Sequence, residues 1–291
     1  MQKVRKAIVS VAGLGTRFLP VTKAMPKEML PVLDKPVLQY IVEELVESGI
    51  EEIIFVTSSQ KRPIEDHFDR DRDFESFLKE KGKLERLEPL IELCKKVRFF
   101  YTRQSEPLGN GHGMLCGREF VGDEPFVFSE GDSIIDAKVP AMKQLLDVFY
   151  KEGASVIGVG KTENKESMIK YGNVYGEKIS ERTYKISEFI EKPPLENVSP
   201  HGIYIAGMRY VFTPDIWPFL QNQKKGRDGE IWLADAANAL AQEKPFFAYE
   251  YEGTYFDTGN KLALLKAALH FAMKDENMKK ELQQICCNRL C

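Results

Sequence analysis

Short, continuous apolar runs recur along the first part of the chain and alternate with stretches of helical periodicity. The runs begin at Val4, Ile53, Val97, Pro125 and Ser155. Runs of this kind are typical of strands in a parallel sheet, because helices cover both faces of such a sheet. The alternation of strand and helix therefore predicts an α/β fold with right-handed crossovers.

The stretch between the first two runs gives the clearest helical pattern. Its apolar positions Val37, Ile41 and Leu45 share one face, and Gly49 ends the pattern. The next apolar run follows almost at once. The sequence therefore predicts a compact helix–strand unit here.

The second half of the chain has a different pattern. Beyond about residue 160, short strands of the antiparallel kind alternate with helices, and a helix over residues 260–273 closes the pattern. We expect a Rossmann-like α/β fold, with a mostly parallel mixed sheet flanked by helices and a smaller antiparallel part. We expect a single domain over 1–273, made of parts at about 1–160 and 161–259 and the closing helix, and then a tail at 274–291.

Composition and charge exclude several classes of protein. The chain has 291 residues, of which 43% are hydrophobic and 29% are charged, and its formal net charge is −3. This charge gives no global attraction to nucleic acid or to an anionic membrane. No apolar run approaches the roughly 18 residues that a membrane span needs. None of the five cysteines forms a C-x-x-C pair, so we expect reduced thiols in a cytoplasmic protein.

A loop rich in glycine and proline follows the first predicted strand. Gly13 and Gly15 fit a G-x-G-x-x-G dinucleotide fingerprint, but Phe18 stands at its third glycine, and the sequence has no G-x-x-x-x-G-K-[ST] loop. Glycines at the edge of a sheet let backbone N–H groups approach a phosphate, and Arg17 and Lys27 add two cations. Phosphoryl or nucleotidyl transfer needs such positive charge. These residues alone leave open a surface loop with incidental charges.

The segment "GLGTRFLPVTKAMPKEMLPVLDKPVLQY" closely resembles the signature G-x-G-T-R-x-x-P-x-T-x-x-x-x-K-x-x-x-P of the sugar-1-phosphate nucleotidylyltransferases. The resemblance extends from about Val4 to Met273 through several separated motifs, and it implies the nucleotide-diphospho-sugar transferase type of fold. Glu28 follows the second basic position of the signature, as in the uridylyl-transferring members. Their thymidylyl-transferring relatives usually have Gln at this position.

The resemblance implies roles for residues in the first part of the chain. It implies a nucleotide-binding set that consists of Ala12, Gly13, Gly15, Glu28, Gln104, Gly109 and Asp132. Gln104 and Gly109 belong to "RQSEPLGNGHGMLCG" and would lie on the uracil, where an amide can pair with the polar edge of the ring. Arg17 and Lys27 match the catalytic cations on the phosphates. We interpret His112 as structural, because nothing nearby resembles a histidine-based catalytic arrangement.

Two aspartates match the metal ligands of the family. Asp132 follows the apolar strand in "EPFVFSEGDSII", and Asp257 lies in "YFDTGNKLALL". The resemblance implies that both bind Mg²⁺, which prefers such hard oxygen ligands together with nucleotide phosphates. The uridylyl-transferring members usually have P-D-D where this chain has Gly131-Asp132-Ser133. The chain is closer here to the G-D-N form of the thymidylyl relatives.

The resemblance also implies a sugar-phosphate set that consists of Gly172, Glu191, Lys192 and Glu230. Glu191 would accept hydrogen bonds from glucose hydroxyls. Lys192 would hold the acceptor phosphate and act as a third catalytic cation. Taken alone, "FIEKP" is more typical of a charged strand end. Its occurrence together with the other motifs favours the site.

As a whole, the resemblance implies an Mg²⁺-dependent enzyme that transfers the uridylyl group of UTP to glucose 1-phosphate and forms UDP-glucose and pyrophosphate. It also implies a homodimer or homotetramer, with no nucleic-acid or membrane partner. The same chemistry with dTTP or another sugar 1-phosphate stays open, as does a non-catalytic regulatory subunit that binds sugar nucleotides. A metal-dependent glycosyltransferase would be expected to lack the loop with Arg17 and Lys27.

Overall fold

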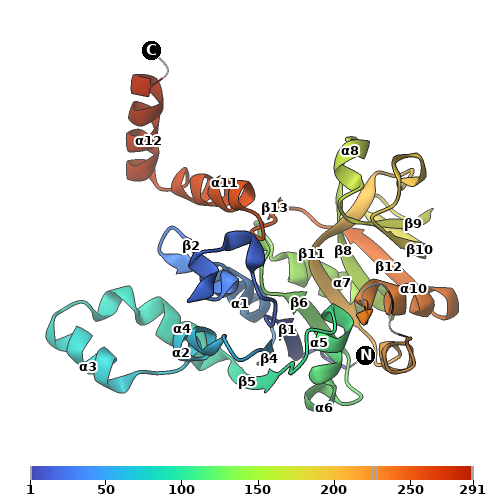
Figure 1. The fold of residues 1–291 in the computed structure, drawn as a ribbon, viewed down its shortest axis with the longest axis horizontal. Coiled ribbons are helices and arrows are strands. Elements are labelled where there is room, and N and C mark those ends of the chain that lie inside the picture. The colour runs from blue at the N-terminus through green and yellow to red at the C-terminus, as the bar shows by residue number, and fades with distance from the viewer. Residues whose placement is uncertain (1, 225, 227–228, 290–291) are drawn as a thin grey trace.

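The computed structural model describes residues 2–224, 226 and 229–289, with side chains up to residue 285. Within these residues, the centre of the molecule is a nine-stranded sheet with the order β5-β4-β1-β6-β11-β8-β12-β10-β9 (Figure 1). Its strands are β1 (Lys6–Ser10), β4 (Glu52–Thr57), β5 (Arg98–Arg103), β6 (Phe126–Glu130), β8 (Ser155–Lys161), β9 (Gly172–Lys178), β10 (Thr183–Glu191), β11 (Ile203–Phe212) and β12 (Phe246–Glu250). Two small ribbons pair β2 (Pro31–Val32) with β3 (Lys35–Pro36) and β7 (Ile134–Asp136) with β13 (Thr254–Phe256).

The large sheet has a parallel half and a mainly antiparallel half. Strand β1 pairs in parallel with β4 and β6, and β4 pairs in parallel with β5. Strand β11 runs antiparallel between β6 and β8, and β9 and β10 pair antiparallel with each other. Strand β12 is parallel to β8 and antiparallel to β10. The predicted mixed sheet is confirmed, and most of its antiparallel pairs come from the second half of the chain.

Helices cover both faces of the large sheet. The helices are α1 (Val37–Glu47), α2 (Arg62–Phe68), α3 (Arg72–Glu80), α4 (Glu88–Lys96), α5 (Asn110–Cys116), α6 (Arg118–Val121), α7 (Ala141–Glu152), α8 (Lys165–Met168), α9 (Ile216–Gln221), α10 (Leu233–Glu243), α11 (Lys261–Ala272) and α12 (Glu276–Arg289). Buried side chains of α1, α2, α4, α7 and α11 pack on one face, and those of α5, α6, α9 and α10 pack on the other. This arrangement explains the continuous apolar runs of β1, β4 and β6, because both of their faces are buried. The run at Val97 differs from the prediction, because β5 is the edge strand of the sheet and most of its residues are exposed.

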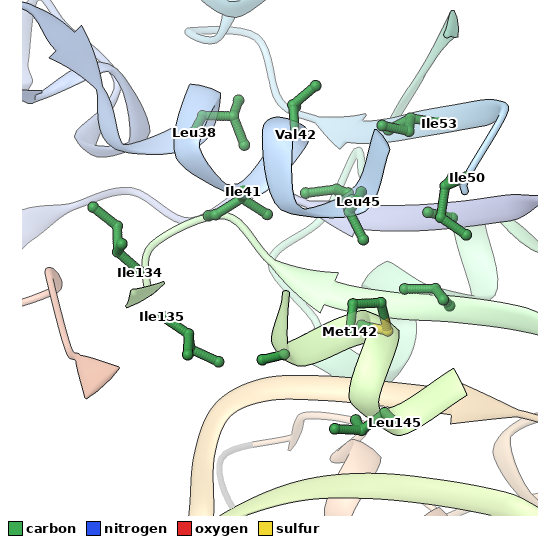
Figure 2. Close-up of a cluster of buried hydrophobic side chains, with 14 of the residues drawn as sticks. Leu38, Ile41, Val42, Leu45, Ile50, Ile53, Ile134, Ile135, Met142 and Leu145 are labelled. Atoms are coloured by element: carbon green, nitrogen blue, oxygen red, sulfur yellow. The ribbon is translucent and has the colours of Figure 1, made fainter. Parts of the chain in front are cut away.

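The face covered by α1 and α7 shows how the pattern becomes a core (Figure 2). Ile41 and Leu45 of α1 are fully buried, as are Ile53 of β4 and Met142 and Leu145 of α7. Full burial of an aliphatic side chain contributes about 1.5–3 kcal/mol to folding. The apolar face predicted for α1 is therefore the face that holds this helix to the sheet.

A buried ion pair joins this core to the loop that follows β6. Arg209 is fully buried, and its Nη2 lies 2.7 Å from Glu44 Oε2. Its Nη1 donates hydrogen bonds to Ser129 Oγ at 2.9 Å and to the carbonyl oxygen of Gly207 at 2.6 Å. Its Nη2 also donates to the carbonyl oxygen of Ser133 at 3.1 Å. The guanidinium thereby fixes the backbone on one side of Asp132, in the loop that leads to the candidate site.

Two helical regions reach beyond the sheet, although α4 and α11 each bury a side chain against it. The mixed-charge stretch at residues 69–96 forms α3 and α4, drawn in cyan at one end of the molecule (Figure 1). At the C-terminal end, α11 occupies the position of the predicted closing helix, and α12 extends away from the body of the molecule. Across the described residues, no helix combines the length and the apolar character that a membrane span requires.

Candidate active site

The loops after β1, β4 and β6 surround a cavity of about 680 Å³ at the carboxyl edge of the sheet. This edge is where ligands bind in open α/β sheets. Nine predicted site residues line the cavity: Ala12, Gly13, Gly15, Lys27, Glu28, Gln104, Gly109, Asp132 and Glu230. Segments far apart in the sequence therefore build one site.

The loop after β1 folds back on itself. It forms three 3₁₀ turns at Thr16–Phe18, Val21–Lys23 and Lys27–Met29. Gly15 has a φ of 67°, in the left-handed region that favours glycine, and its carbonyl oxygen accepts a hydrogen bond from Thr22 Oγ1 at 2.8 Å. A Cβ at Gly15 would lie only 3.1 Å from Lys27 Cβ. The glycine thus lets the two ends of the loop touch and places Lys27 at the cavity.

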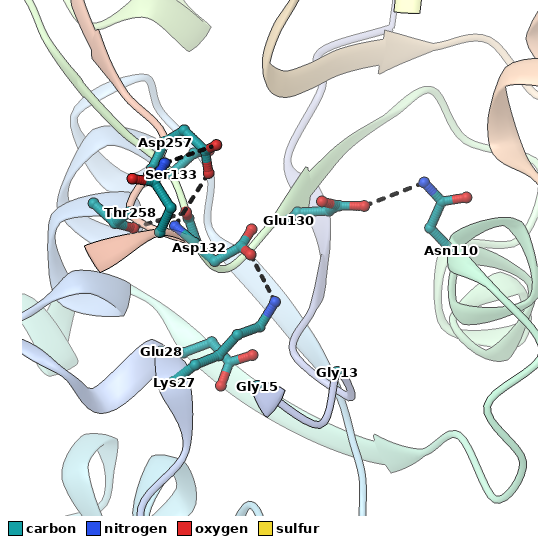
Figure 3. A network of polar contacts seen from close by, with 12 residues as sticks. Gly13, Gly15, Lys27, Glu28, Asn110, Glu130, Asp132, Ser133, Asp257 and Thr258 are labelled. Carbon is teal, nitrogen blue, oxygen red and sulfur yellow. Dashed lines mark hydrogen bonds and ion pairs between the residues drawn. The ribbon is translucent and has the colours of Figure 1, made fainter. Parts of the chain in front are cut away.

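Lys27 and Asp132 form an ion pair in the cavity, with 2.6 Å between Nζ and Oδ2 (Figure 3). Burial lowers the pKa of Lys27, but the charges of Asp132 and Glu28 more than offset this, so the pKa lies above its usual value. Burial raises the pKa of Asp132, but Lys27 and then Arg17 bring it below its usual value. Both groups are therefore charged at neutral pH, and a phosphate that enters the cavity meets a fixed cation.

Glu28 is held by a lysine that the sequence reading missed. The Nζ of Lys61 donates hydrogen bonds to Glu28 Oε2 and to the carbonyl oxygen of Gly13, both at 2.7 Å. Glu28 Oε1 is buried and has no hydrogen-bond partner among the described residues. Burial raises the pKa of Glu28, and the charges of Lys61 and Lys27 partly oppose this. Nothing in "SSQKRP" distinguishes Lys61 from a surface lysine before the fold is known.

Gln104 and Gly109 form the opposite wall of the cavity. Gln104 Nε2 donates to the carbonyl oxygen of Gly109 at 2.9 Å and lies 3.1 Å from His112 Nδ1, so His112 orients the amide. Gly109 has a φ of 90°, and a Cβ at this position would lie 2.7 Å from the carbonyl oxygen of Ile231. Only glycine fits this approach. Glu230 lies directly against Gly109 and completes the wall.

Glu130, the last residue of β6, also lines the cavity and was missed from the sequence. Asn110 Nδ2 donates to its Oε1 at 3.2 Å (Figure 3). Burial and the charge of Asp132 raise the pKa of Glu130 to about 7. Its position at the end of a buried strand, two residues before Asp132, was the signal that could have identified it.

The β7–β13 ribbon brings Asp257 close to Asp132. Thr258 Oγ1 donates to the carbonyl oxygen of Asp132 at 2.7 Å. A Cβ built on Gly259 would lie 3.0 Å from Asp257 Oδ1 and 3.3 Å from Asp132 Oδ2. The same point lies 2.9 Å from Arg17 Nη2. Two carboxylates and a guanidinium therefore converge on one small space, which the glycine keeps open.

The remaining predicted residues meet where β9 and β10 pair. Gly172 and Glu191 are cross-strand partners, and a Cβ at Gly172 would lie 2.7 Å from Glu191 Oε2. Lys192 has a φ of 47°, and its Nζ lies 3.6 Å from Glu191 Oε1. Burial raises the pKa of Glu191, and Lys192 partly opposes this. These three residues do not line the cavity, but the charge of Glu191 contributes to the raised pKa of Glu130, so the two sets are electrostatically connected.

The fold and the site together define the class of protein. Residues 6–274 match the model of the nucleotidyl transferase family, and the chain belongs to this family. The chain is 48% identical over 282 residues to UTP–glucose-1-phosphate uridylyltransferase of Bacillus subtilis (strain 168), an alignment that covers 97% of this chain and 96% of that protein. It is 46% identical over 282 residues to UTP–glucose-1-phosphate uridylyltransferase 2 of Staphylococcus saprophyticus, with the same coverage.

Solved structures give the same result. The chain superimposes on the UTP-bound UGPase from Acinetobacter baumannii with a TM-score of 0.89 and 33% identity, over 99% of this chain and 100% of that one. A UDP-glucose pyrophosphorylase complexed with UDP-glucose matches with a TM-score of 0.86 and 34% identity, over 94% of this chain and 100% of that one. The family and the fold that the sequence signature indicated are confirmed.

Proposed function

We propose that this chain transfers the uridylyl group of UTP to glucose 1-phosphate and forms UDP-glucose and pyrophosphate. The observation that carries the proposal is the unpaired Oε1 of Glu28, a buried acceptor at the cavity beside the cation of Lys27. An ionised carboxylate is an acceptor only, so it can receive the N3–H of uracil but opposes a base with an acceptor at that position. The names of relatives that align almost end to end support UTP and glucose 1-phosphate as the substrates.

The two sets of residues suggest a division of the domain 1–273. We assign the nucleotide to the part at about 1–160, with Gln104 and Gly109 on the uracil opposite Glu28 and with the remaining members of this set at Ala12, Gly13, Gly15 and Asp132. We assign the sugar phosphate to the part at about 161–259. There Glu191 accepts hydrogen bonds from sugar hydroxyls beside Gly172, Lys192 holds the acceptor phosphate, and Glu230 lies near the boundary between the parts.

The chemistry follows from this placement. An oxygen of the sugar phosphate attacks the α-phosphorus of UTP in line. A new P–O bond forms as the bond between the α-phosphorus and the bridging oxygen of pyrophosphate breaks. The attacking oxygen is already anionic, so the reaction needs no protein base. Lys27, Arg17 and Lys192 offset the negative charge of the crowded phosphates and stabilise the transition state.

The donor set also fits a divalent metal ion. Asp132 and Asp257 present carboxylate oxygens to the small space beside Gly259. Hard oxygen ligands and phosphates are what Mg²⁺ prefers, so we propose Mg²⁺ with these two aspartates as its protein ligands. When bound, the ion would neutralise phosphate charge and help to orient the triphosphate.

A row of apolar side chains supports the proposal that the protein is a homodimer or homotetramer. Leu262, Leu265, Leu269 and Met273 are exposed along α11 and its C-cap. Association with a second copy of the chain would bury these side chains. Light scattering of the intact chain tests this, and Leu265→Glu should shift the mass towards the monomer. We also propose a cytoplasmic location, with support from the free thiols Cys94 and Cys116.

The decisive assay measures pyrophosphate release with glucose 1-phosphate and a panel of nucleoside triphosphates. UTP should be the preferred substrate, and chelation by EDTA should stop turnover until Mg²⁺ is restored. A preference for dTTP would assign the chain to thymidylyl transfer instead. Binding of UDP-glucose without turnover would support the regulatory-subunit alternative, and turnover that is insensitive to EDTA would contradict the metal assignment.

A further inference from the structure

Glu130 is a carboxylate in the cavity for which the nucleotide chemistry described above has no use. It closes β6, and its Oε1 accepts a hydrogen bond from Asn110 Nδ2 at 3.2 Å. The orientation of Asn110 is itself fixed, because its Oδ1 accepts the backbone N–H of Leu233 at 3.0 Å, at the start of α10. The Asn110 amide therefore turns its NH₂ group towards Glu130 and holds the carboxylate in place (Figure 3).

The second oxygen of Glu130 remains available. Among the described residues, no hydrogen bond reaches Oε2, and the side chain lines the cavity. A partly desolvated carboxylate with a free acceptor is unfavourable unless a ligand or water supplies a donor. The fold thus keeps a fixed and unsatisfied acceptor at the wall of the site.

The surroundings of Glu130 indicate which part of the substrate it meets. Glu130 lines the same cavity as Lys27 and Asp132 and as Glu230. Lys27 and Asp132 mark the proposed phosphate position, and Glu230 belongs to the proposed sugar-phosphate set. An acceptor in this wall is placed for a group on the sugar close to its phosphate.

We propose that Glu130 is a sugar-specificity residue, whose Oε2 accepts a hydrogen bond from one hydroxyl group of the sugar 1-phosphate. This inference rests on the proposed function, because it requires a sugar phosphate in the site. A hydroxyl is the donor that a sugar offers in this position, and a buried acceptor that is left without its donor discriminates against an analogue that lacks the hydroxyl. A sugar 1-phosphate without that hydroxyl leaves Glu130 unpaired and binds poorly.

The test compares the wild type with Glu130→Leu and a control, Glu80→Gln, whose carboxylate is exposed on α3. Pyrophosphate release is measured at saturating UTP with glucose 1-phosphate and with its 2-, 3-, 4- and 6-deoxy analogues. For the wild type and the control, one analogue should raise KM by roughly 10- to 100-fold over glucose 1-phosphate. Glu130→Leu should raise KM for glucose 1-phosphate by a similar factor and should no longer distinguish that analogue, while its KM for UTP stays within about twofold.

A second variant covers the possibility that Glu130→Leu does not fold. In Glu130→Ala, the shorter side chain carries neither an acceptor nor a donor, so the same discrimination should be lost. An unchanged ranking of the deoxy analogues in the variant that folds would overturn the role of Glu130. A rise confined to KM for UTP would also overturn it, in favour of the ribose. A wild type that uses no sugar 1-phosphate at all would instead contradict the proposed function.

Discussion

Two buried ion pairs in this protein differ in how many of their hydrogen-bonding atoms have a partner. Beneath the sheet, Arg209 directs all its N–H groups to protein acceptors, and both oxygens of Glu44 accept from it. Glu44 Oε1 also accepts the backbone N–H of Met142 at 3.0 Å. In the cavity, Lys61 binds one oxygen of Glu28, but the other oxygen has no partner among the described residues.

Under the proposed function, the difference separates a structural ion pair from one that is prepared for a ligand. A buried acceptor without a partner costs about 1–3 kcal/mol of stability. The Arg209 network avoids this cost and ties the Asp132 loop to the core. The Glu28 pair carries this cost, and its free oxygen supports the proposal that Glu28 accepts a hydrogen bond from the substrate. The two pairs therefore differ in unsatisfied hydrogen-bonding capacity and not in burial.

The largest effect should come from breaking the structural pair. Arg209→Met leaves Glu44 charged and unpaired, which should lower the free energy of unfolding by about 3–5 kcal/mol. The double variant Arg209→Met, Glu44→Leu removes both charges and should recover most of this loss. Urea unfolding followed by circular dichroism measures both. A single variant that is as stable as the double variant would show that the pair is not a structural element.

Lys27→Ala should lower activity more than stability, in contrast to Arg209→Met. Removing a cation that acts on the transition state should lower kcat by about 10²–10³, or about 3–4 kcal/mol, with a smaller change in unfolding free energy. The matched control is Lys23→Ala, because Lys23 is an exposed lysine of the same loop that does not line the cavity. Near-normal turnover of the Lys27→Ala protein would contradict its assignment.

The parts of this molecule that local pattern determines were predictable. The runs at Val4, Ile53 and Pro125 became β1, β4 and β6, because a strand buried on both faces must be continuously apolar. The family signature located Lys27 and Glu28 in the loop after the first strand. The position of this loop at the carboxyl edge of the sheet follows from topology alone.

Pairings between distant segments were not predictable from the same patterns. Strand β11 enters between β6 and β8, although many residues separate these strands in sequence, and no periodicity encodes that choice. Lys61 was missed for the same reason, because the partner that it holds at 2.7 Å, Glu28, lies elsewhere in the chain. Glu130 was missed although its position at the end of a buried strand, two residues before Asp132, could have identified it.

The variant Lys61→Met tests whether the charge of Lys61 keeps Glu28 ionised. Without Lys61, the pKa of Glu28 should rise further, because burial already raises it and the main opposing charge is gone. Under the proposed function, the ionised form accepts the uracil N–H more strongly than the protonated form, so a higher pKa means weaker UTP binding at neutral pH. KM for UTP should increase by roughly 10-fold near pH 7.

The sign of the pH dependence makes this prediction specific. Raising the pH restores the Glu28 carboxylate, so KM for UTP in Lys61→Met should fall as the pH is raised, with a smaller change in the wild type. KM for glucose 1-phosphate serves as the internal control. A KM for UTP that rises equally at every pH would mean that Lys61 acts through the Gly13 carbonyl and not through Glu28.

A partly exposed ionic cluster should show the smallest effect in this comparison. Asp136 Oδ2 lies 2.6 Å from His270 Nε2 and also forms an ion pair with Lys274. These contacts connect β7 to α11 and to the turn after α11. Burial raises the pKa of Asp136, but these two partners more than offset this and the pKa lies below its usual value. Asp136→Asn should cost less than about 1 kcal/mol, because water reaches and screens this partly exposed cluster.

A carboxylate with a lowered pKa, such as Asp136, stabilises the folded state above the unfolded-state pKa of about 4. The difference between wild type and variant in urea unfolding should therefore be complete near neutral pH and should disappear as the pH falls below about 4. A loss as large as that of Arg209→Met would show that exposure does not separate these clusters.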